Sequence, residues 1–307
     1  MLLATDDGVE EESEPLSDLL SAGEKDGSEE GVILSPSLTA EQQRDCHQVL
    51  GQFASLFSLI PRVTHLSIHD MDTRDSTPIK QKVYRVTDKV RASIKDEVSK
   101  MLTLGVIKHS SSPWTSPVIL VPKELRFCVD YRGLNAVSET DAHPIPRADE
   151  LIDRLGAAKY LSTSDLTSGY CKIALTEGAK ERSAFSTADV CFQFKVIPFG
   201  MKNTPATFQR LVNQVLAGLD EFSAAYLDDT AVFRSTWEEH LKHLCKVLEA
   251  LQKAGLTIKA SKCLIGQGSV VYLGHQVGSD QVVPLQPEID TILAWEPPKT
   301  QTEVEPF

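Results

Sequence analysis

Residues 222–233 read FSAAYLDDTAVF, two apolar runs separated by a pair of acidic residues. Runs at 222–227 and 230–233 predict two strands, with Asp228 and Asp229 in a tight hairpin turn between them. Adjacent carboxylates repel each other, and a bound divalent cation relieves that repulsion because Mg²⁺ prefers oxygen ligands. Asp-Asp is also ordinary turn sequence. On these four residues alone, YLDD at 226–229, the turn interpretation is the stronger one.

A second acidic strand end changes this balance. The stretch LSTSDLTSGY at 161–170 places Asp165 at the end of a predicted strand, ahead of a loop that contains Gly169. Three carboxylates at strand ends can hold two metal ions roughly 4 Å apart, the arrangement used for in-line phosphoryl transfer. Taken by itself, Asp165 fits a helix N-cap or a turn residue equally well.

The rest of the chain mixes helices and strands without regular alternation, which favours an α+β fold. Apolar residues at helical spacing predict a helix over 88–104, ended by Gly105, and Gly255 is the expected end of a later helix. Predicted helix starts are Thr39 with Gln42 in a capping box, Thr204 ahead of Pro205, and Ser235 with Glu238 in a second capping box. Short apolar runs predict strands at 117–122, 125–130, 160–165, 171–175, 183–187 and 192–197.

The formal net charge of the 307 residues is −12, which at first argues against a nucleic-acid partner. Residues 1–34, however, hold eleven acidic residues and one lysine, so −10 of that charge lies in this stretch. We expect residues 1–36 to form a disordered acidic tail, because so few apolar groups cannot offset the entropy of ordering. The remaining −2 is compatible with a local basic groove.

Targeting and redox signals are weak. The sequence has no run of about 18 apolar residues and no signal-peptide core, so we expect no membrane association and an intracellular location, cytoplasmic or nuclear, without secretion. Six scattered cysteines without a CxxC pair predict reduced thiols and make a structural zinc site improbable.

Six motifs in a fixed order make the sequence similar to a known family. They are SSPWTSPV at 111–118, RFCVDYRGLN at 126–135, DLTSGY at 165–170, PFGMKNTPATFQ at 198–209, YLDD at 226–229 and YLGH at 272–275. In this order they resemble the reverse transcriptase of gypsy-type LTR retrotransposons, within a Pol polyprotein, from about residue 38 to the C-terminus. The resemblance implies a right-hand polymerase architecture with fingers and palm, a truncated thumb, and RNA-directed DNA polymerase activity.

The resemblance also implies roles for individual residues. Asp165, Asp228 and Asp229 match the catalytic carboxylates, which hold two Mg²⁺ ions, with Mn²⁺ as a substitute. Tyr170 matches the aromatic residue beneath the incoming sugar, although alone it reads as a core tyrosine. The other matched positions are Arg126 and the weaker Lys123 at the triphosphate, Phe199, Gly200 and Gln209 near nucleotide and template, and Tyr272, Leu273, Gly274 and His275 in the primer grip. The implied partners are an RNA or DNA template with its primer, and deoxynucleoside triphosphates.

Two departures from the family pattern leave alternatives open. The fingers hairpin has only Glu124 and Leu125 between Lys123 and Arg126, and Val190 stands where relatives commonly place glycine, at a cost if the turn needs a positive φ. A catalytically inactive remnant that binds nucleic acid or protein is therefore a second hypothesis. A third hypothesis is that the chain is a fragment of a polyprotein and carries that polyprotein's name, for example ribonuclease H, without such a domain. Expected boundaries are a tail at 1–36, a helix and linker at 37–83, fingers and palm at 84–280, and the start of a thumb at 281–307.

Overall fold

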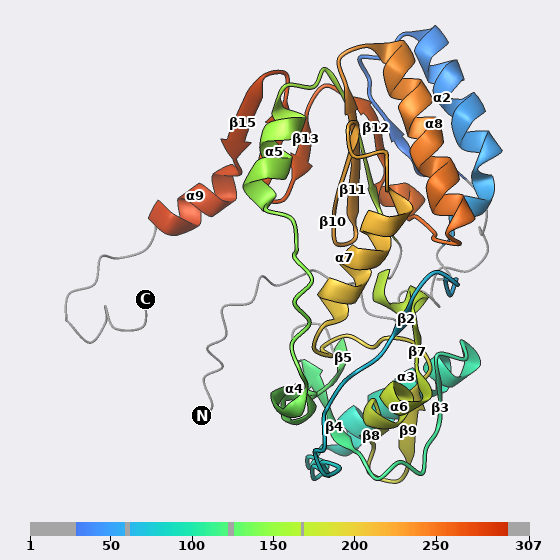
Figure 1. Cartoon of the computed structure of the whole chain (residues 1–307), viewed down its shortest axis with the longest axis vertical. Helices are drawn as coiled ribbons and strands as arrows, with labels where there is room; N and C mark the ends of the chain where they lie inside the picture. Colours follow the sequence, from blue (N-terminus) through green and yellow to red (C-terminus); the bar gives the residue numbers. More distant parts are fainter. Residues whose placement is uncertain (1–28, 59–61, 122–125, 167–168, 294–307) are drawn as a thin grey trace.

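The computed structural model describes residues 29–58, 62–121, 126–166 and 169–293. The described chain forms two lobes, each built around its own five-stranded sheet (Figure 1). Helices and strands are mixed without regular alternation, so the predicted α+β class is confirmed. Within these residues, no helix is both long and apolar enough to cross a membrane.

The first lobe contains a central sheet with strand order β1-β12-β6-β11-β10. Strands β6, β11 and β10 run antiparallel to their neighbours, whereas β1 pairs parallel with β12 at the edge. The bounds are β1 Ile33–Leu34, β12 Leu264–Gln267, β6 Tyr160–Asp165, β11 Asp229–Arg234 and β10 Ser223–Tyr226.

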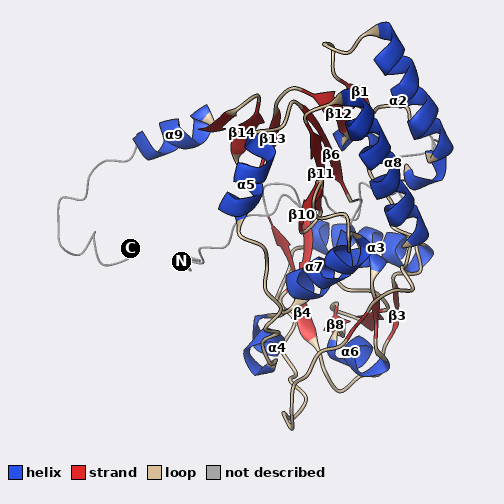
Figure 2. Ribbon diagram, turned by 45° about the horizontal axis from the view of Figure 1, so that its top comes forward, coloured by secondary structure: helices blue, strands red, loops and turns tan. Residues whose placement is uncertain are grey.

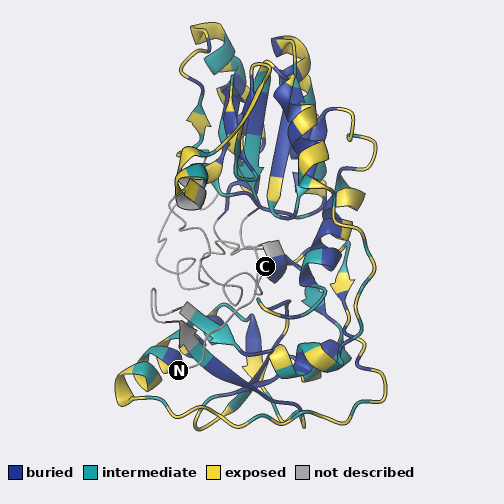
Figure 3. Cartoon of the chain, turned by 90° about the vertical axis from the view of Figure 1, so that its left-hand side faces the viewer, coloured by how far each residue is buried: buried dark blue, intermediate teal, exposed yellow. Residues whose placement is uncertain are grey.

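Both faces of the central sheet are covered, as the alternation of its side chains requires. Helices α2 (Ala40–Gln52) and α8 (Trp237–Lys253) lie against one face (Figure 2). On the other face, Leu161 and Phe233 join a second apolar cluster with α5 (Ala148–Gly156) and a small sheet. The strands between these layers are buried, while the outer sides of the helices are exposed (Figure 3).

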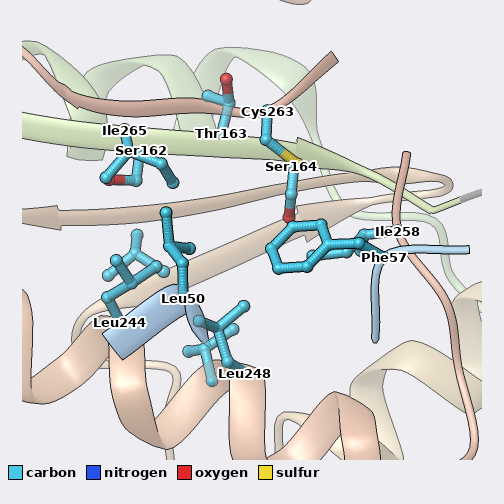
Figure 4. Close-up of a pocket in the computed structure, with 12 residues that line it drawn as sticks. Leu50, Phe57, Ser162, Thr163, Ser164, Leu244, Leu248, Ile258, Cys263 and Ile265 are labelled. Atoms are coloured by element: carbon cyan, nitrogen blue, oxygen red, sulfur yellow. The ribbon is translucent and has the colours of Figure 1, made fainter. Parts of the chain in front are cut away.

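A small cavity of about 10 Å³ lies between the central sheet and the helices of its first face. Leucines from α2 and α8 face Ser162 and Ser164 across it (Figure 4). Its volume is close to that of a single water molecule, so this layer is packed nearly to completion.

The second lobe contains a sheet of order β3-β9-β8-β4-β5, covered by short helices. Its elements are α3 Asp88–Thr103, β3 Ile107–His109, β4 Ser116–Val121, β5 Arg126–Val129, α4 Arg132–Val137, α6 Glu177–Arg182, β8 Phe185–Ser186 and β9 Cys191–Phe194. A two-stranded parallel sheet, β2 Ile68–His69 with β7 Ala174–Leu175, and helix α7 (Thr204–Val215) lie between the two lobes (Figure 1).

A separate three-stranded antiparallel sheet follows the central sheet in sequence. It consists of β13 Val270–Tyr272, β14 His275–Gly278 and β15 Gln281–Pro284, and α9 (Gln286–Leu293) follows it. The expected boundary between residues 280 and 281 falls between β14 and β15, which pair with each other, and it stays a prediction.

The structure also bears on the expected end of the acidic tail. Residues 1–28 lie outside the described residues, but Ile33 and Leu34 form β1. The amide of Ile33 donates to the Cys263 carbonyl at 2.9 Å, and the amide of Ser35 donates to the Ile265 carbonyl at 2.9 Å. These hydrogen bonds pair the backbone of the segment with β12, so the ordered chain includes residues that we assigned to the tail.

Helix ends were predicted with mixed success. The capping box at Thr39 is present, with both reciprocal bonds to Gln42, and Gly105 and Gly255 have the left-handed φ expected after a helix. The predicted caps at Thr204 and Ser235 are wrong, because the N-cap residues are Asn203 and Thr236. The predicted strand at 171–175 begins instead as the 3₁₀ helix η2 (Gly169–Lys172).

Candidate active site

The hairpin between β10 and β11 turns at Leu227 and Asp228, one residue earlier than predicted. Leu227 has φ of +50°, a left-handed conformation that costs a non-glycine residue free energy. Asp229 already belongs to β11, where its backbone pairs with Tyr226. The turn therefore separates the two acidic residues: Asp228 lies in the loop and Asp229 begins the strand.

Strand pairing brings the third carboxylate to the same place. In the antiparallel register of β6 and β11, Asp165 lies directly opposite Asp229. Opposite residues project from the same face of the sheet with Cβ atoms about 5 Å apart. The amide of Leu166 donates to the carbonyl of Asp228 at 3.0 Å, so Asp165 and Asp228 are also fixed close together. The structure thus gathers all three predicted catalytic residues, Asp165, Asp228 and Asp229, where β6 ends and β11 begins. We call this group of carboxylates the acidic edge.

One positive side chain, that of Lys262, contacts this acidic edge. The ammonium of Lys262 lies 3.0 Å from Oδ2 of Asp165, and the amide of Lys259 donates to the Asp165 carbonyl at 3.1 Å. Among the described residues, no three His, Cys, Asp or Glu side chains are grouped closely enough to hold a metal ion. The donor set itself fits a hard divalent cation, because it offers only carboxylate oxygens. Coordination by Oδ2 of Asp165 requires that Lys262 move away.

Gln209, which we placed near the nucleotide and template, is completely buried on α7. Its Oε1 accepts a hydrogen bond from the amide of Leu227 at 2.8 Å, and its Nε2 donates to the Ala225 carbonyl at 3.1 Å and to Asn213 Oδ1 at 2.9 Å. Both ends of the amide are therefore engaged with the hairpin or with α7. In this geometry Gln209 supports the acidic turn, and its contact with a nucleotide or template stays a prediction.

Tyr170, five residues after Asp165, is buried, with only 3% of its surface exposed. Its ring packs edge-on against Phe199, with centroids 5.5 Å apart, and against Phe208, with centroids 5.6 Å apart. The structure therefore places two of the predicted nucleotide-binding aromatic residues, Tyr170 and Phe199, in contact. Their contact with a sugar stays a prediction.

The turn after Phe199 is held by the second lobe. Gly200 has φ of +83°, which explains glycine at this position, and its carbonyl accepts a hydrogen bond from Asn135 Nδ2 at 2.8 Å. Asn135 Oδ1 in turn accepts from the amide of Lys202 at 2.9 Å. We had not singled out Asn135, although it lies in the quoted RFCVDYRGLN motif.

Of the two residues predicted to contact the triphosphate, the structure describes only Arg126. The backbone of Arg126, the first residue of β5, pairs with Val121, the last residue of β4. Lys123 and the short hairpin loop at 122–125 lie outside the described residues. The roles of both residues remain predictions.

The predicted primer grip forms the turn between β13 and β14. Leu273 and Gly274 have φ of +47° and +75°, as in a two-residue hairpin, and His275 Nδ1 lies 3.0 Å from the Leu273 carbonyl. Tyr272 is buried, and its hydroxyl donates to the carbonyl of Asp229 at 3.4 Å. Burial raises the pKa of Tyr272 well above its ordinary value. Tyr272 therefore packs beneath the acidic edge, whereas the other three residues are partly exposed.

Val190 does not have the strain that the family pattern suggested. It is absent from the described non-glycine residues with positive φ, and its carbonyl accepts a hydrogen bond from the amide of Thr187 at 3.0 Å. Thr187 Oγ1 accepts in return from the amide of Val190 at 3.2 Å. This turn forms with valine without a left-handed residue, so Val190 is no argument for an inactive chain.

A family profile identifies the chain by sequence. Residues 108–277, which include all three acidic residues and the primer-grip turn, match the profile described as "Reverse transcriptase (RNA-dependent DNA polymerase)". The chain belongs to the reverse transcriptase family. The central sheet and its helices are therefore the palm of this reverse transcriptase, and the second lobe is its fingers.

Curated relatives are Pol polyproteins of LTR retrotransposons. The chain is 33% identical over 248 residues to the retrovirus-related Pol polyprotein from transposon 297 of Drosophila melanogaster, covering 78% of the chain and 23% of the relative. It is 32% identical over 294 residues to that of transposon opus from the same organism, covering 90% of the chain and 29% of the relative. The chain thus spans between a fifth and a third of the length of these relatives.

Solved reverse transcriptases share the fold. A foamy viral protease-reverse transcriptase in complex with double-stranded DNA matches with a TM-score of 0.79 at 22% identity, over 98% of this chain and 53% of the other. The same viral protein in complex with an RNA/DNA hybrid matches with a TM-score of 0.76 at 24% identity, over 88% and 37%. The predicted fingers and palm architecture is confirmed.

Proposed function

We propose that this chain is the polymerase core of a gypsy-type LTR retrotransposon, which transfers nucleotides from deoxynucleoside triphosphates to a primer 3′-hydroxyl on an RNA or DNA template. The observation that carries the proposal is the register of β6 against β11, which sets Asp165 opposite Asp229 and next to the Asp228 turn. The six motifs and the transposon relatives support the gypsy-type assignment.

In this proposal Asp165, Asp228 and Asp229 hold two divalent cations, Mg²⁺ by preference. When bound, such ions lower the pKa of the primer hydroxyl and stabilise the charge on the leaving pyrophosphate. Gln209 and Tyr272 hold the two sides of the acidic hairpin from beneath, so the carboxylates are fixed before the substrates arrive. Tyr170 borders the sugar and excludes a 2′-hydroxyl by its bulk.

The proposal also covers the boundaries and the location. Fingers and palm extend over about 84–280, and Leu273, Gly274 and His275 contact the primer. Arg126 and Lys123 contact the triphosphate from the fingers hairpin. An intracellular location is supported by the six scattered cysteines, which form no CxxC pair.

The test is extension of oligo(dT) on poly(rA) by the full chain with Mg²⁺, compared with Asp228→Asn. We expect metal-dependent extension by the unmodified chain and a loss of at least 10³-fold in the variant, as when a group acting only in the transition state is removed. Absence of extension by the folded chain, both alone and fused to the region that follows the matching segment in its Pol relatives, would favour the inactive remnant. A structure with bound Mn²⁺ would report the ligands independently of activity.

A further inference from the structure

The segment that joins α4 of the fingers to α5 of the palm has no part in the proposed mechanism. We call this segment, residues 138–147, the connector. The chain crosses here from one lobe to the other, along the first half of α7 (Figure 1). A segment without helix or strand keeps one conformation only where other groups satisfy its backbone and side chains. The contacts of the connector therefore decide how firmly it joins the lobes.

Asn203, the residue before α7, binds the connector with both ends of its side-chain amide. Its Oδ1 accepts a hydrogen bond from the amide of Asp141 at 2.9 Å, and its Nδ2 donates to the carbonyl of Glu139 at 2.7 Å. An asparagine at a helix start usually accepts from the amides of its own helix, and Asn203 makes no such bond. Its side chain is directed to the connector instead.

Arg210 holds the same residue of the connector from two turns further along α7. Its Nη2 lies 2.7 Å from Oδ1 and 2.5 Å from Oδ2 of Asp141. Oδ1 of Asp141 also accepts a hydrogen bond from the amide of His143 at 2.9 Å, so this carboxylate orders the backbone that follows it. Asn203 and Arg210 thus grip Asp141 by its backbone and by its side chain.

Neighbouring positions of the connector are held as well. The ammonium of Lys202 donates to the carbonyl of Ser138 at 2.7 Å, and Glu139 pairs with Arg74 at 2.7 Å. A single exposed ion pair restricts a chain little, whereas several contacts to consecutive residues select one path. The connector is therefore fixed on α7 where it leaves the fingers.

We propose that Asn203 and Arg210 are positioning residues, which hold the fingers at the distance from the acidic edge that binding of the nucleotide triphosphate requires. They act through Asp141 and the connector. The inference rests on the proposed function, in which Arg126 contacts the triphosphate and the palm carboxylates hold the metal ions. Arg126 lies on β5, and α4 follows β5 after two residues, so a displacement of α4 would move Arg126 with it.

The two roles of α7 predict different kinetic effects. Gln209 holds the acidic hairpin, whereas Asn203 and Arg210 hold the connector. Release of the connector leaves the bond between Gln209 and Leu227 in place, so the carboxylates should stay where they are. It should therefore weaken nucleotide binding, seen as a higher KM, and leave kcat almost unchanged.

The experiment compares variants of the full chain by kcat and KM for dTTP on poly(rA) with oligo(dT). Hydrogen exchange of connector peptides, read by mass spectrometry, reports the clamp independently of activity. Arg210→Gln removes the guanidinium, and Arg210→Lys keeps its charge. Asn203→Gly removes both amide bonds and still allows the left-handed backbone of this residue, at φ of +68°.

Arg147→Gln is the matched control. Arg147 is an exposed arginine at the other end of the connector, and its Nη2 lies 2.5 Å from Oδ2 of Asp149 within the first turn of α5. Its ion pair therefore does not reach α7. Exchange, KM and kcat should all stay at their original values in this variant.

We expect Arg210→Gln and Asn203→Gly to raise KM about fivefold, the fold-change that matches the upper range for a partly exposed ion pair. Their kcat should change less than about twofold, and their connector amides should exchange faster. Arg210→Lys should recover most of the original KM. Asp141→Asn combined with Arg210→Gln should be no worse than either change alone, because the two residues act as a pair.

The remaining outcomes overturn the inference. Unchanged exchange in a folded Arg210→Gln shows that there is no clamp, and faster exchange with an unchanged KM shows that the clamp does not position the fingers. In both cases primer extension by the unmodified chain still supports the proposed function. If Arg210→Gln does not fold, Asp141→Asn decides by the same two measurements. If the unmodified chain extends no primer, the proposed function fails and this inference fails with it.

Discussion

Gln209 Oε1 accepts a hydrogen bond from the backbone amide of Leu227 at 2.8 Å, across 18 residues of sequence. Leu227 is the residue of the acidic hairpin with the unfavourable left-handed backbone, at φ of +50°. A buried side chain on α7 thus fixes the one conformation of the turn that places Asp228 beside Asp165. Strain at the turn is tolerated because the surrounding structure determines it.

Replacing Gln209 by methionine should lower activity by loosening this turn. The change keeps the side-chain volume but leaves the buried Leu227 amide without its acceptor, which costs about 1–3 kcal/mol. We expect kcat for nucleotide addition to fall at least tenfold while KM for the nucleotide changes less than threefold, because the carboxylates move and the binding surface does not. Steady-state extension on poly(rA) with oligo(dT) measures both.

The control for this change is Gln214→Met, an exposed glutamine on the same helix. If Gln209→Met raised KM and left kcat unchanged, Gln209 would contact the nucleotide, as the family pattern first indicated.

The case of Gln209 shows what sequence pattern can and cannot predict. The motifs were enough to predict the three acidic residues as a metal site, because each carboxylate lies in a short motif at the end of a predicted strand. The partner of Gln209 is a backbone amide, and backbone groups carry no sequence signal. The bond depends on how α7 packs across β10, which is a tertiary property.

Local rules failed where tertiary contacts decided the outcome. Ser235 and Glu238 have capping-box spacing, yet α8 begins after Thr236, because its buried face must start at Trp237. Ile33 and Leu34 looked like part of an acidic tail, and a distant strand, β12, orders them. Lys262 gave no signal because lysines are usually solvated, and only the fold brings its ammonium to Asp165.

The ring of Tyr272 should contribute much more to the free energy of unfolding than its hydroxyl does. The hydroxyl bond to the Asp229 carbonyl is long, at 3.4 Å, so Tyr272→Phe should lower the free energy of unfolding by less than about 1 kcal/mol. Tyr272→Ala removes a buried ring from the cluster around Leu161 and Phe233 and should cost about 3–5 kcal/mol. Urea unfolding of the two variants measures the difference. A large loss in Tyr272→Phe would mean that the bond to Asp229 contributes most of the stability.

Two substitutions at Tyr170 should distinguish its role in core packing from its role in selecting deoxyribonucleotides over ribonucleotides. Tyr170→Phe keeps the ring and its edge-on contacts with Phe199 and Phe208, so discrimination against ribonucleotides should stay near its original value. Tyr170→Val should cost about 2–4 kcal/mol of unfolding free energy and should raise the relative use of ribonucleotides at least tenfold. Competition between dTTP and UTP on poly(rA) measures the selectivity. Unchanged selectivity in a folded Tyr170→Val would return Tyr170 to the role of a core tyrosine.

His240 should make the palm sensitive to mild acid. It is completely buried beneath the central sheet, its Nε2 lies 2.7 Å from Ser162 Oγ, and burial lowers its pKa to about 4. The unfolded chain binds a proton near pH 6.5 and the folded chain only near pH 4, so stability is complete above about 6.5 and is lost as the pH falls toward 4. This one group should contribute a loss of about 2–3 kcal/mol over that window.

Urea unfolding at pH 7 and pH 5 tests the expectation, with His240→Gln as the variant that cannot take up the proton. The variant should be less stable than the unmodified chain at pH 7, because it alters the bond to Ser162. It should also lose less stability between pH 7 and pH 5. His65→Gln, at an exposed position, should keep the original pH dependence. If the unmodified chain and His240→Gln lost stability in parallel, other groups would cause the acid sensitivity. His69 would then be the first to test, because burial lowers its pKa to about 4 as well.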